Sequence, residues 1–218
     1  PLNISMDPNL FFVEDGTDEV IESLLWARNE LWEVPYAKIL NISCPNTSDG
    51  KSFQEPDKLD KLLSRTDRRK IRRDVYVKFS PDLTDEQFDE LLDVCGDHRV
   101  AGYVTGNTTT KREGLNTNPD TVYTTGNGGL SGTPAMQRNL EMVSFAKKKH
   151  PNRFVIGVGG IGCDPYSSPE YDTYIYLRAG ADMVQVLTGI PYYGFGIFKR
   201  INKKLPEWLE SSGFSSVE

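Results

Sequence analysis

Residues 154–187 read FVIGVGGIGCDPYSSPEYDTYIYLRAGADMVQVL, and this stretch decides the fold class. It opens with a short apolar run, Phe154–Val158, of the length expected for a buried strand. A helical stretch from about Glu170 to Ala179 follows and ends at Gly180, and a second apolar run covers Met183–Leu187. A strand, a helix and another strand in this order predict two parallel strands joined through a helix.

The same alternation extends through the rest of the chain. Four further apolar runs predict strands, at Leu2–Met6, Ala37–Ile42, Val75–Phe79 and Gly102–Thr105. Helices are expected at about 17–32, around Leu59–Leu63, at Thr84–Gly96, at Thr133–Lys149 and at about Phe195–Ser211. Thr84 begins its helix with a capping box. A long loop is expected at about 106–132. Strict alternation with near-continuous apolar strands predicts a parallel sheet covered on both faces. Both an open doubly wound sheet and a (β/α)8 barrel fit, as a single domain over residues 1–218.

Composition narrows the functional class. The chain has 218 residues, 38% of them hydrophobic, and a net charge of -6, which fits one soluble domain and argues against a nucleic-acid partner. No apolar run approaches the roughly 18 residues of a membrane helix. Three widely spaced cysteines and two histidines, His98 and His150, both expected at the surface near helix ends, predict no metal site. A reducing, cytoplasmic location fits this cysteine usage.

Polar and glycine-rich segments follow the predicted strands. They are Asn41–Thr47, Gly106–Thr109, Gly128–Gly132, Gly159–Gly160 and Leu187–Gly189. In β/α barrels the active site lies at the carboxyl ends of the strands, so these segments are expected to converge on one face. The glycine-rich segments can turn backbone N–H groups toward a phosphate, although a lone Gly-Gly pair is usually only a tight turn.

Lys78 and Cys44 each allow a structural and a functional interpretation. Lys78 lies inside an apolar strand, where it either reaches outward to solvent or places a cation beside an electron-rich cofactor. Cys44 directly follows a strand and is either a small buried hydrophobic residue or a tuned thiolate that acts as base or nucleophile. Asn41 and Asn46, which flank Cys44, are suitable hydrogen-bond partners for a planar substrate with carbonyl and N–H edges.

Five motifs together resemble one enzyme family. They are NISCPNT at 41–47, VKFSPDLT at 77–84, NTT at 107–109, GGLSG at 128–132 and IGVGG at 156–160. In this order they resemble dihydroorotate dehydrogenase. The resemblance implies an FMN-dependent (β/α)8 barrel that oxidises (S)-dihydroorotate to orotate in de novo pyrimidine biosynthesis.

The resemblance also implies residue roles. Cys44 is the expected general base, and Asn41, Asn46, Asn107 and Thr108 are the expected substrate-binding residues. The residues expected to bind FMN are Asn3, Asn41, Lys78, Gly106, Ser131, Gly132, Val158, Gly159, Gly160, Leu187, Thr188 and Gly189.

The chain departs from the family pattern in two respects. Six predicted strands stand where the family has eight, so we expect an N-terminally truncated barrel with an incomplete FMN site and little or no activity by itself. The long loop with GGLSG resembles the quinone-using class, which usually has threonine at position 106, whereas Cys44 resembles the soluble class that uses fumarate or an NAD-linked subunit. The electron acceptor therefore stays open among these three. A homodimer is expected, as is peripheral membrane association if the missing N-terminus carries a quinone-site extension.

Three other interpretations remain at this point. One is the pyrimidine-reducing domain of dihydropyrimidine dehydrogenase, which shares an Asn-x-Ser-Cys-Pro stretch. A second is a barrel similar to tRNA dihydrouridine synthase, which needs a basic RNA-binding surface. The third is an inactive fragment that only binds FMN or a partner.

Overall fold

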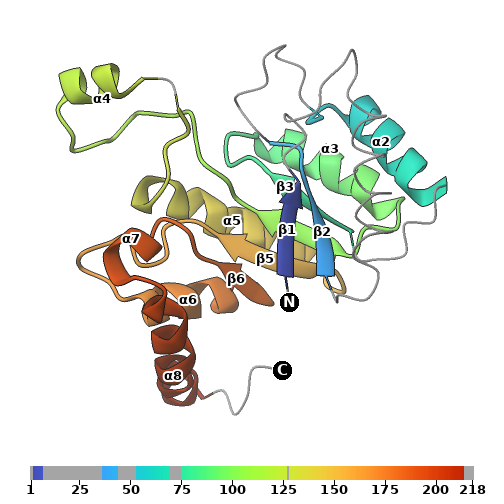
Figure 1. The fold of residues 1–218 in the computed structure, drawn as a ribbon. Coiled ribbons are helices and arrows are strands. Elements are labelled where there is room, and N and C mark those ends of the chain that lie inside the picture. Colours follow the sequence, from blue (N-terminus) through green and yellow to red (C-terminus); the bar gives the residue numbers. More distant parts are fainter. Residues whose placement is uncertain (1, 7–35, 44–52, 69–74, 127, 214–218) are drawn as a thin grey trace. The chain divides into compact units, whose positions relative to one another are not determined.

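The computed structural model describes residues 2–6, 36–43, 53–68, 75–126 and 128–213 (Figure 1). The chain divides into two compact units, Pro1–Val104 and Thr105–Glu218. The boundary falls inside a strand, β4 (Gly102–Thr105). Whether the chain is a single domain stays a prediction.

Unit 1 is built on parallel strands. β1 (Leu2–Met6) pairs with β2 (Tyr36–Asn41), and β2 pairs with β3 (Val75–Phe79), both in parallel. Beyond β3 the next strand in the sheet is β4. Two helices, α2 (Pro56–Arg68) and α3 (Asp85–Gly96), lie side by side (Figure 1).

The core of unit 1 forms where the apolar faces of its helices meet the strands. The Phe79 ring on β3 packs edge-on against Phe88 of α3 at 5.1 Å and lies 5.9 Å from the Tyr103 ring. The predicted capping box of α3 is present: Thr84 Oγ1 accepts from the Gln87 N–H at 3.2 Å, and Gln87 Oε1 accepts from the Thr84 N–H at 3.0 Å. This cap fixes where α3 begins and so directs its apolar face to the strands.

Unit 2 places helices around a second parallel pair. α5 (Thr133–Lys149) precedes β5 (Phe154–Val158), and α6 (Pro169–Arg178) leads to β6 (Met183–Gln185), which pairs with β5 in parallel. α5 packs on β5, and the last helix, α8 (Gly196–Ser211), packs on α6. The fully buried side chains of this unit include Met142, Val143, Ala146, Val155, Tyr176 and Ile197.

The predicted elements are largely confirmed. β1, β3, β4, α5 and β5 have the predicted bounds, and β2 is shifted by one residue. The predicted helix at 17–32 lies outside the described residues. The parallel pairing of β1 with β2, of β2 with β3 and of β5 with β6 confirms the predicted parallel sheet.

Three differences have local causes. The loop prediction for 106–132 is wrong at α4 (Pro119–Thr125), which buries no residue and therefore has no apolar periodicity to detect. A short helix, α7 (Ile190–Tyr193), precedes α8, and β6 ends two residues before the predicted Leu187. Leu187 is 76% exposed, so its side chain does not pack into the core and does not lengthen the buried strand.

His98 corrects a second expectation. It follows α3 near its end as predicted, but its side chain is only 9% exposed and lies between Asp60 and Asp67 of α2.

Among the helices that the structure describes, none has the length and apolar character needed to cross a bilayer.

Candidate functional site

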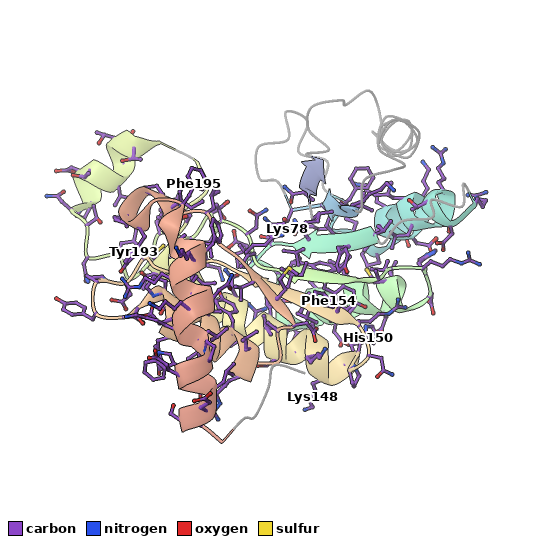
Figure 2. The ribbon with its side chains drawn as sticks, turned by 60° about the horizontal axis from the view of Figure 1, so that its bottom comes forward. Lys78, Lys148, His150, Phe154, Tyr193 and Phe195 are labelled. Atoms are coloured by element: carbon purple, nitrogen blue, oxygen red, sulfur yellow. The ribbon has the colours of Figure 1, made fainter. Side chains whose placement is uncertain are left out.

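Two predicted site residues of unit 1 lie opposite each other. Asn41 ends β2, and its register partner on β3 is Lys78. Figure 2 labels Lys78. Asn41 is half-buried, and its Oδ1 accepts a hydrogen bond from the Ser43 hydroxyl at 2.9 Å. Because the strands are parallel, both residues stand at the carboxyl end of the sheet, as expected for barrel active-site groups.

Lys78 is the half-buried member of an otherwise buried strand. Burial lowers the pKa of its ammonium group from the usual value, because the charged form loses solvation. This environment strengthens the interaction of the cation with any anionic group brought to it.

Three predicted residues of the first unit cannot be placed as side chains. Cys44 and Asn46 lie outside the described residues. Asn3 lies on β1, where its backbone is in register with Ala37 of β2. The proposed general base and part of the proposed substrate site therefore rest on the sequence.

The remaining predicted residues belong to unit 2, where several segments meet. The backbone at Gly106 (φ +111°) lies so close to its neighbours that a Cβ there would stand 2.6 Å from the Val158 carbonyl oxygen and 2.5 Å from Asn139 Cγ. This crowding accounts for glycine at position 106. The segment after β4 is thereby packed directly against the end of β5.

The Asn107–Thr109 segment is joined to the glycine-rich loop. Thr109 and Leu130 exchange two backbone hydrogen bonds of 2.9 and 2.7 Å as an antiparallel bridge. Gly129 approaches Thr108 so closely that only glycine fits. Asn107 and Thr108 are both half-buried, and Asn107 Oδ1 accepts from the Thr108 N–H at 2.9 Å. The two predicted substrate residues therefore lie beside the loop that leads into α5.

α5 begins without a side-chain cap. Its N-cap is Gly132 (φ +91°), and no side-chain cap hydrogen bond is found there among the described residues. Ser131, directly before it, is exposed. Such a helix start leaves backbone donors and the positive end of the helix dipole for an anion.

The turns after β5 and β6 complete this arrangement. A Cβ at Gly132 would lie 3.7 Å from Cys163 Cβ, just beyond the Val158–Gly160 turn. A Cβ at Gly189, which follows β6, would collide with the Ile161 carbonyl oxygen. Leu187 is exposed, Thr188 half-buried and Gly189 buried. The structure thus brings together the predicted cofactor residues of unit 2 that follow β4, β5 and β6 and precede α5.

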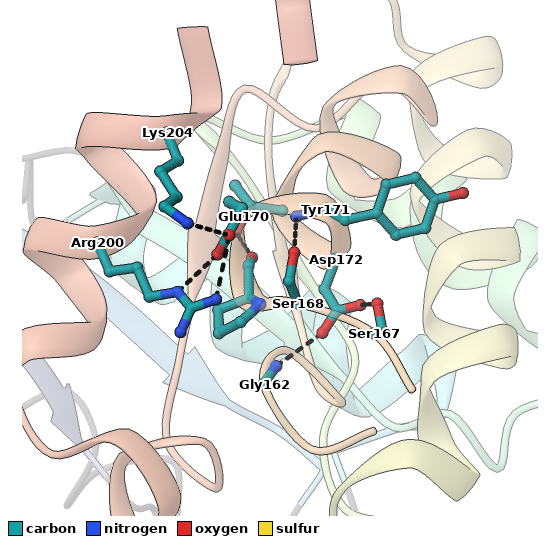
Figure 3. Close-up of polar contacts among 10 residues, drawn as sticks. Gly162, Ser167, Ser168, Glu170, Tyr171, Asp172, Arg200 and Lys204 are labelled. Atoms are coloured by element: carbon teal, nitrogen blue, oxygen red, sulfur yellow. Dashed lines mark hydrogen bonds and ion pairs between the residues drawn. The ribbon is translucent and has the colours of Figure 1, made fainter. Parts of the chain in front are cut away.

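Asp172 and Glu170 are two carboxylates that the sequence analysis did not single out. Both hold the part of the chain that follows the Val158–Gly160 turn (Figure 3). Asp172, 2% exposed, accepts from the Gly162 N–H at 2.8 Å and from the Ser167 hydroxyl at 2.5 Å. Burial raises the pKa of Asp172, and these two hydrogen bonds oppose the rise without cancelling it. An Asp two residues into a predicted helix gives no sequence signal of this role.

Glu170 links α6 to α8 (Figure 3). Arg200 contacts both of its oxygens, at 2.9 and 3.2 Å, and Lys204 lies 3.6 Å away. Burial by itself raises the pKa of Glu170, but the Arg200 hydrogen bonds and the two cations outweigh it and leave the pKa below its usual value. This ion pair anchors the final helix to α6.

The residues present fit a phosphate-bearing group. Glycines make up much of the turns that meet here, Ser131 and Thr188 belong to these turns and carry hydroxyl groups, and α5 begins there without a side-chain cap. In the described part of the chain, no cluster of three or more His, Cys, Asp or Glu side chains could hold a metal ion.

Comparison with known proteins identifies the family. The dihydroorotate dehydrogenase family model matches residues 7–209. A protein of Chloroflexus aurantiacus named dihydroorotate dehydrogenase (quinone) is 40% identical over an alignment of 184 residues, which covers 78% of this chain and 48% of that protein. The protein of the same name from Christiangramia forsetii is 32% identical over an alignment of 195 residues, which covers 87% of this chain and 54% of that protein.

Solved structures agree with this match. The structure of the Eimeria tenella enzyme (DHODH) in complex with ferulenol aligns with a TM-score of 0.80 and 25% identity over 99% of this chain and 59% of that one. The chain spans about half the length of the curated relatives it matches. Its fold is that of the (β/α)8-barrel family, of which the described residues contain six strands. The chain belongs to the dihydroorotate dehydrogenase family.

Proposed function

We propose that the protein oxidises (S)-dihydroorotate to orotate, with FMN as cofactor, in pyrimidine biosynthesis. The observation that carries this proposal is the convergence, in unit 2, of the family's glycine-containing turns on the uncapped start of α5. Ser131, Gly132, Val158, Gly159, Gly160, Leu187, Thr188 and Gly189 would hold the phosphate and ribityl chain of FMN, and Gly106 lets the segment after β4 approach them.

The reaction removes a proton from C5 and a hydride from C6 of dihydroorotate, which leaves the C5–C6 double bond of orotate. When bound, FMN supplies the hydride acceptor. Cys44 takes the C5 proton as its thiolate, a role that its position three residues after the end of β2 supports. The proton leaves on sulfur and the electron pair of the C6–H bond leaves as hydride, so atoms and charges balance.

Neutral amides and one cation complete the proposed site. Asn41, Asn46, Asn107 and Thr108 would hydrogen-bond the carbonyl, N–H and carboxylate groups of the substrate. Lys78, opposite Asn41 in the sheet, would stabilise negative charge on the cofactor ring. Asn3 is the proposed flavin-side residue of β1.

A quinone is the proposed electron acceptor. The curated relatives described above are both named as quinone enzymes. The test is re-oxidation of the dihydroorotate-reduced protein under anaerobic conditions by a short-chain ubiquinone, by fumarate or by NAD⁺. Rapid re-oxidation by the ubiquinone alone supports the proposal, and re-oxidation by fumarate or NAD⁺ alone would assign the protein to the other class. The proposed homodimer stays a prediction.

The first experiment is an anaerobic visible spectrum of the purified protein before and after addition of dihydroorotate. A bound-flavin band that bleaches as the substrate is oxidised supports both the cofactor and the substrate assignment. A protein that takes up FMN but does not bleach with dihydroorotate would belong to another kind of flavin-dependent barrel, and a protein that takes up no FMN would refute the cofactor assignment.

Variants of Cys44 test the general base. Cys44→Ala should slow bleaching by about 100-fold or more with FMN still bound, since general-base catalysis contributes roughly that much. Cys44→Ser should retain part of the rate with its pH dependence moved to higher pH. Cys95→Ala is the matched control, because Cys95 is a buried residue of α3, and it should bleach at the parent rate. Equal rates in the parent and Cys44→Ala would exclude Cys44 as the base.

A further inference from the structure

Two buried polar side chains hydrogen-bond to backbone carbonyl oxygens of the Val158–Gly160 turn. Asn139 of α5 donates its Nδ2–H to the Val158 carbonyl oxygen at 2.8 Å. Tyr176 of α6 donates its hydroxyl hydrogen bond to the Gly159 carbonyl oxygen at 2.8 Å and lies 3.3 Å from the Val158 oxygen. Both side chains are 0% exposed. The two helices that flank β5 therefore each contribute one donor to the same turn.

Glycines make room for both side chains. The Gly106 and Gly159 backbones lie directly against the Asn139 amide, and Gly157 lies against the Tyr176 ring. A Cβ at Gly106 would stand 2.7 Å from Asn139 Oδ1. The pair thus occupies a space that three glycines on two segments leave for it.

Asn139 is an unfavourable choice for stability alone. Its Oδ1 is buried, and within the described residues no donor reaches it. A buried acceptor without a donor destabilises a fold, and an apolar side chain of similar shape would avoid that cost. What the amide adds, and an apolar side chain could not, is the donor to the Val158 carbonyl.

Holding these two carbonyls fixes the two N–H groups that follow. In a planar trans peptide the C=O and the next N–H point in opposite directions, and the described part of the chain has no cis peptide bond. The Val158 and Gly159 carbonyls turn toward the buried pair, so the N–H groups of Gly159 and Gly160 turn away from it. Both glycines have positive φ, +115° and +78°, a conformation that side-chain-bearing residues rarely adopt.

We propose that Asn139 and Tyr176 are positioning residues, which orient the Gly159 and Gly160 N–H groups toward the phosphate of the flavin cofactor. The inference rests on the proposed function, because it takes FMN as the ligand of this turn. The inference predicts that loss of either side chain weakens binding of the phosphate group more than binding of the rest of the flavin.

The test compares FMN with riboflavin, which lacks the phosphate. Dissociation constants are measured by flavin fluorescence for the parent and for Tyr176→Phe, which keeps the ring and removes the hydroxyl. We expect the constant for FMN to rise about tenfold, the effect of weakening one or two hydrogen bonds to an anion. The constant for riboflavin should change less than about twofold. Tyr174→Phe is the matched control, since Tyr174 is a buried tyrosine of the same helix whose hydroxyl contacts Ser212 at 2.5 Å.

A second variant separates positioning from folding. Asn139→Leu removes the donor and the unpartnered acceptor together, so urea unfolding of the flavin-free protein should show unchanged or higher stability. Its FMN affinity should nevertheless fall relative to its riboflavin affinity. Gln137→Leu, an exposed residue of α5 that contacts Glu141 at 2.9 Å, is the control and should change neither affinity.

The outcomes distinguish this inference from the proposed function. A parent that prefers FMN to riboflavin, with the preference reduced in both variants and kept in both controls, supports it. A parent that prefers FMN, with variants that lose both ligands equally or neither, overturns the positioning role alone. A parent that binds neither flavin, or binds both equally, overturns the proposed phosphate site and this inference with it.

Discussion

Gly106 occupies a position where any side chain would collide with two neighbours. Gly106→Ala would place a Cβ 2.5 Å from Asn139 Cγ and 2.6 Å from the Val158 oxygen, at a φ of +111°. Overpacking and backbone strain each cost about 1–3 kcal/mol, so we expect the free energy of unfolding to fall by about 3 kcal/mol in urea titrations. Gly114→Ala is the control, with φ +73° and nothing within 4 Å of the new Cβ. It should lose only about 1 kcal/mol, and equal losses would contradict the crowding at Gly106.

His98 should act as a stabilising cation at mildly acidic pH. Burial by itself lowers the pKa of His98, but hydrogen bonds to Asp67 (2.8 Å) and Asp60 (3.0 Å) and their charges outweigh it, and the pKa is raised. A raised folded-state pKa contributes stability that is fully present below the unfolded value of about 6.5 and is lost as pH rises through the folded value. We expect the imidazole of the folded protein to titrate above about 6.5 by NMR, and lower in Asp67→Asn than in the parent. A midpoint at or below the value measured in urea would show that the two aspartates do not hold the charged form.

At the scale of elements, two helix caps of similar chemistry should differ in their effect. Thr84 caps α3, whose buried face includes Phe88, Leu91 and Leu92, whereas Asn118 caps α4, which buries no residue. Thr84→Ala should lower the global free energy of unfolding by about 1 kcal/mol, because α3 forms with the core of unit 1. Asn118→Ala should leave it nearly unchanged and instead speed proteolysis within α4, because a helix without buried contacts opens locally. A global loss of similar size in both variants would refute this distinction.

At the scale of the whole molecule, cofactor binding should protect unit 2 at defined places. The converging turns at 128–132, 158–162 and 187–189 all belong to Thr105–Glu218. Hydrogen exchange followed by mass spectrometry, with FMN and without it, should show slower exchange in peptides that cover these turns. Peptides from α4 serve as the internal control and should exchange alike in both samples. Protection absent from all three turns would place the cofactor elsewhere.

The sequence by itself determined the elements whose signals are local. Val75–Phe79, Gly102–Thr105, Thr133–Lys149 and Phe154–Val158 have the predicted bounds, because short apolar runs and flanking Gly or Pro residues specify strands and helices without reference to distant contacts. The order of the motifs likewise predicted the family that the comparisons then established. Residues such as Gly159 and Gly160 could be nominated because a phosphate-binding turn needs glycine whatever surrounds it.

Only the tertiary structure decided which side chains support that turn. Asn139 and Tyr176 lie 19 and 18 residues from Val158, on different helices, and neither belongs to a recognisable motif. His98 meets aspartates 31 and 38 residues away, so a residue expected at the surface is a half-buried ion-pair partner. α4 escaped prediction because it has no buried face. For Asn139, Tyr176 and His98 the deciding interaction joins residues that the chain brings together only by folding, and neither apolar periodicity nor residue spacing encodes such pairs.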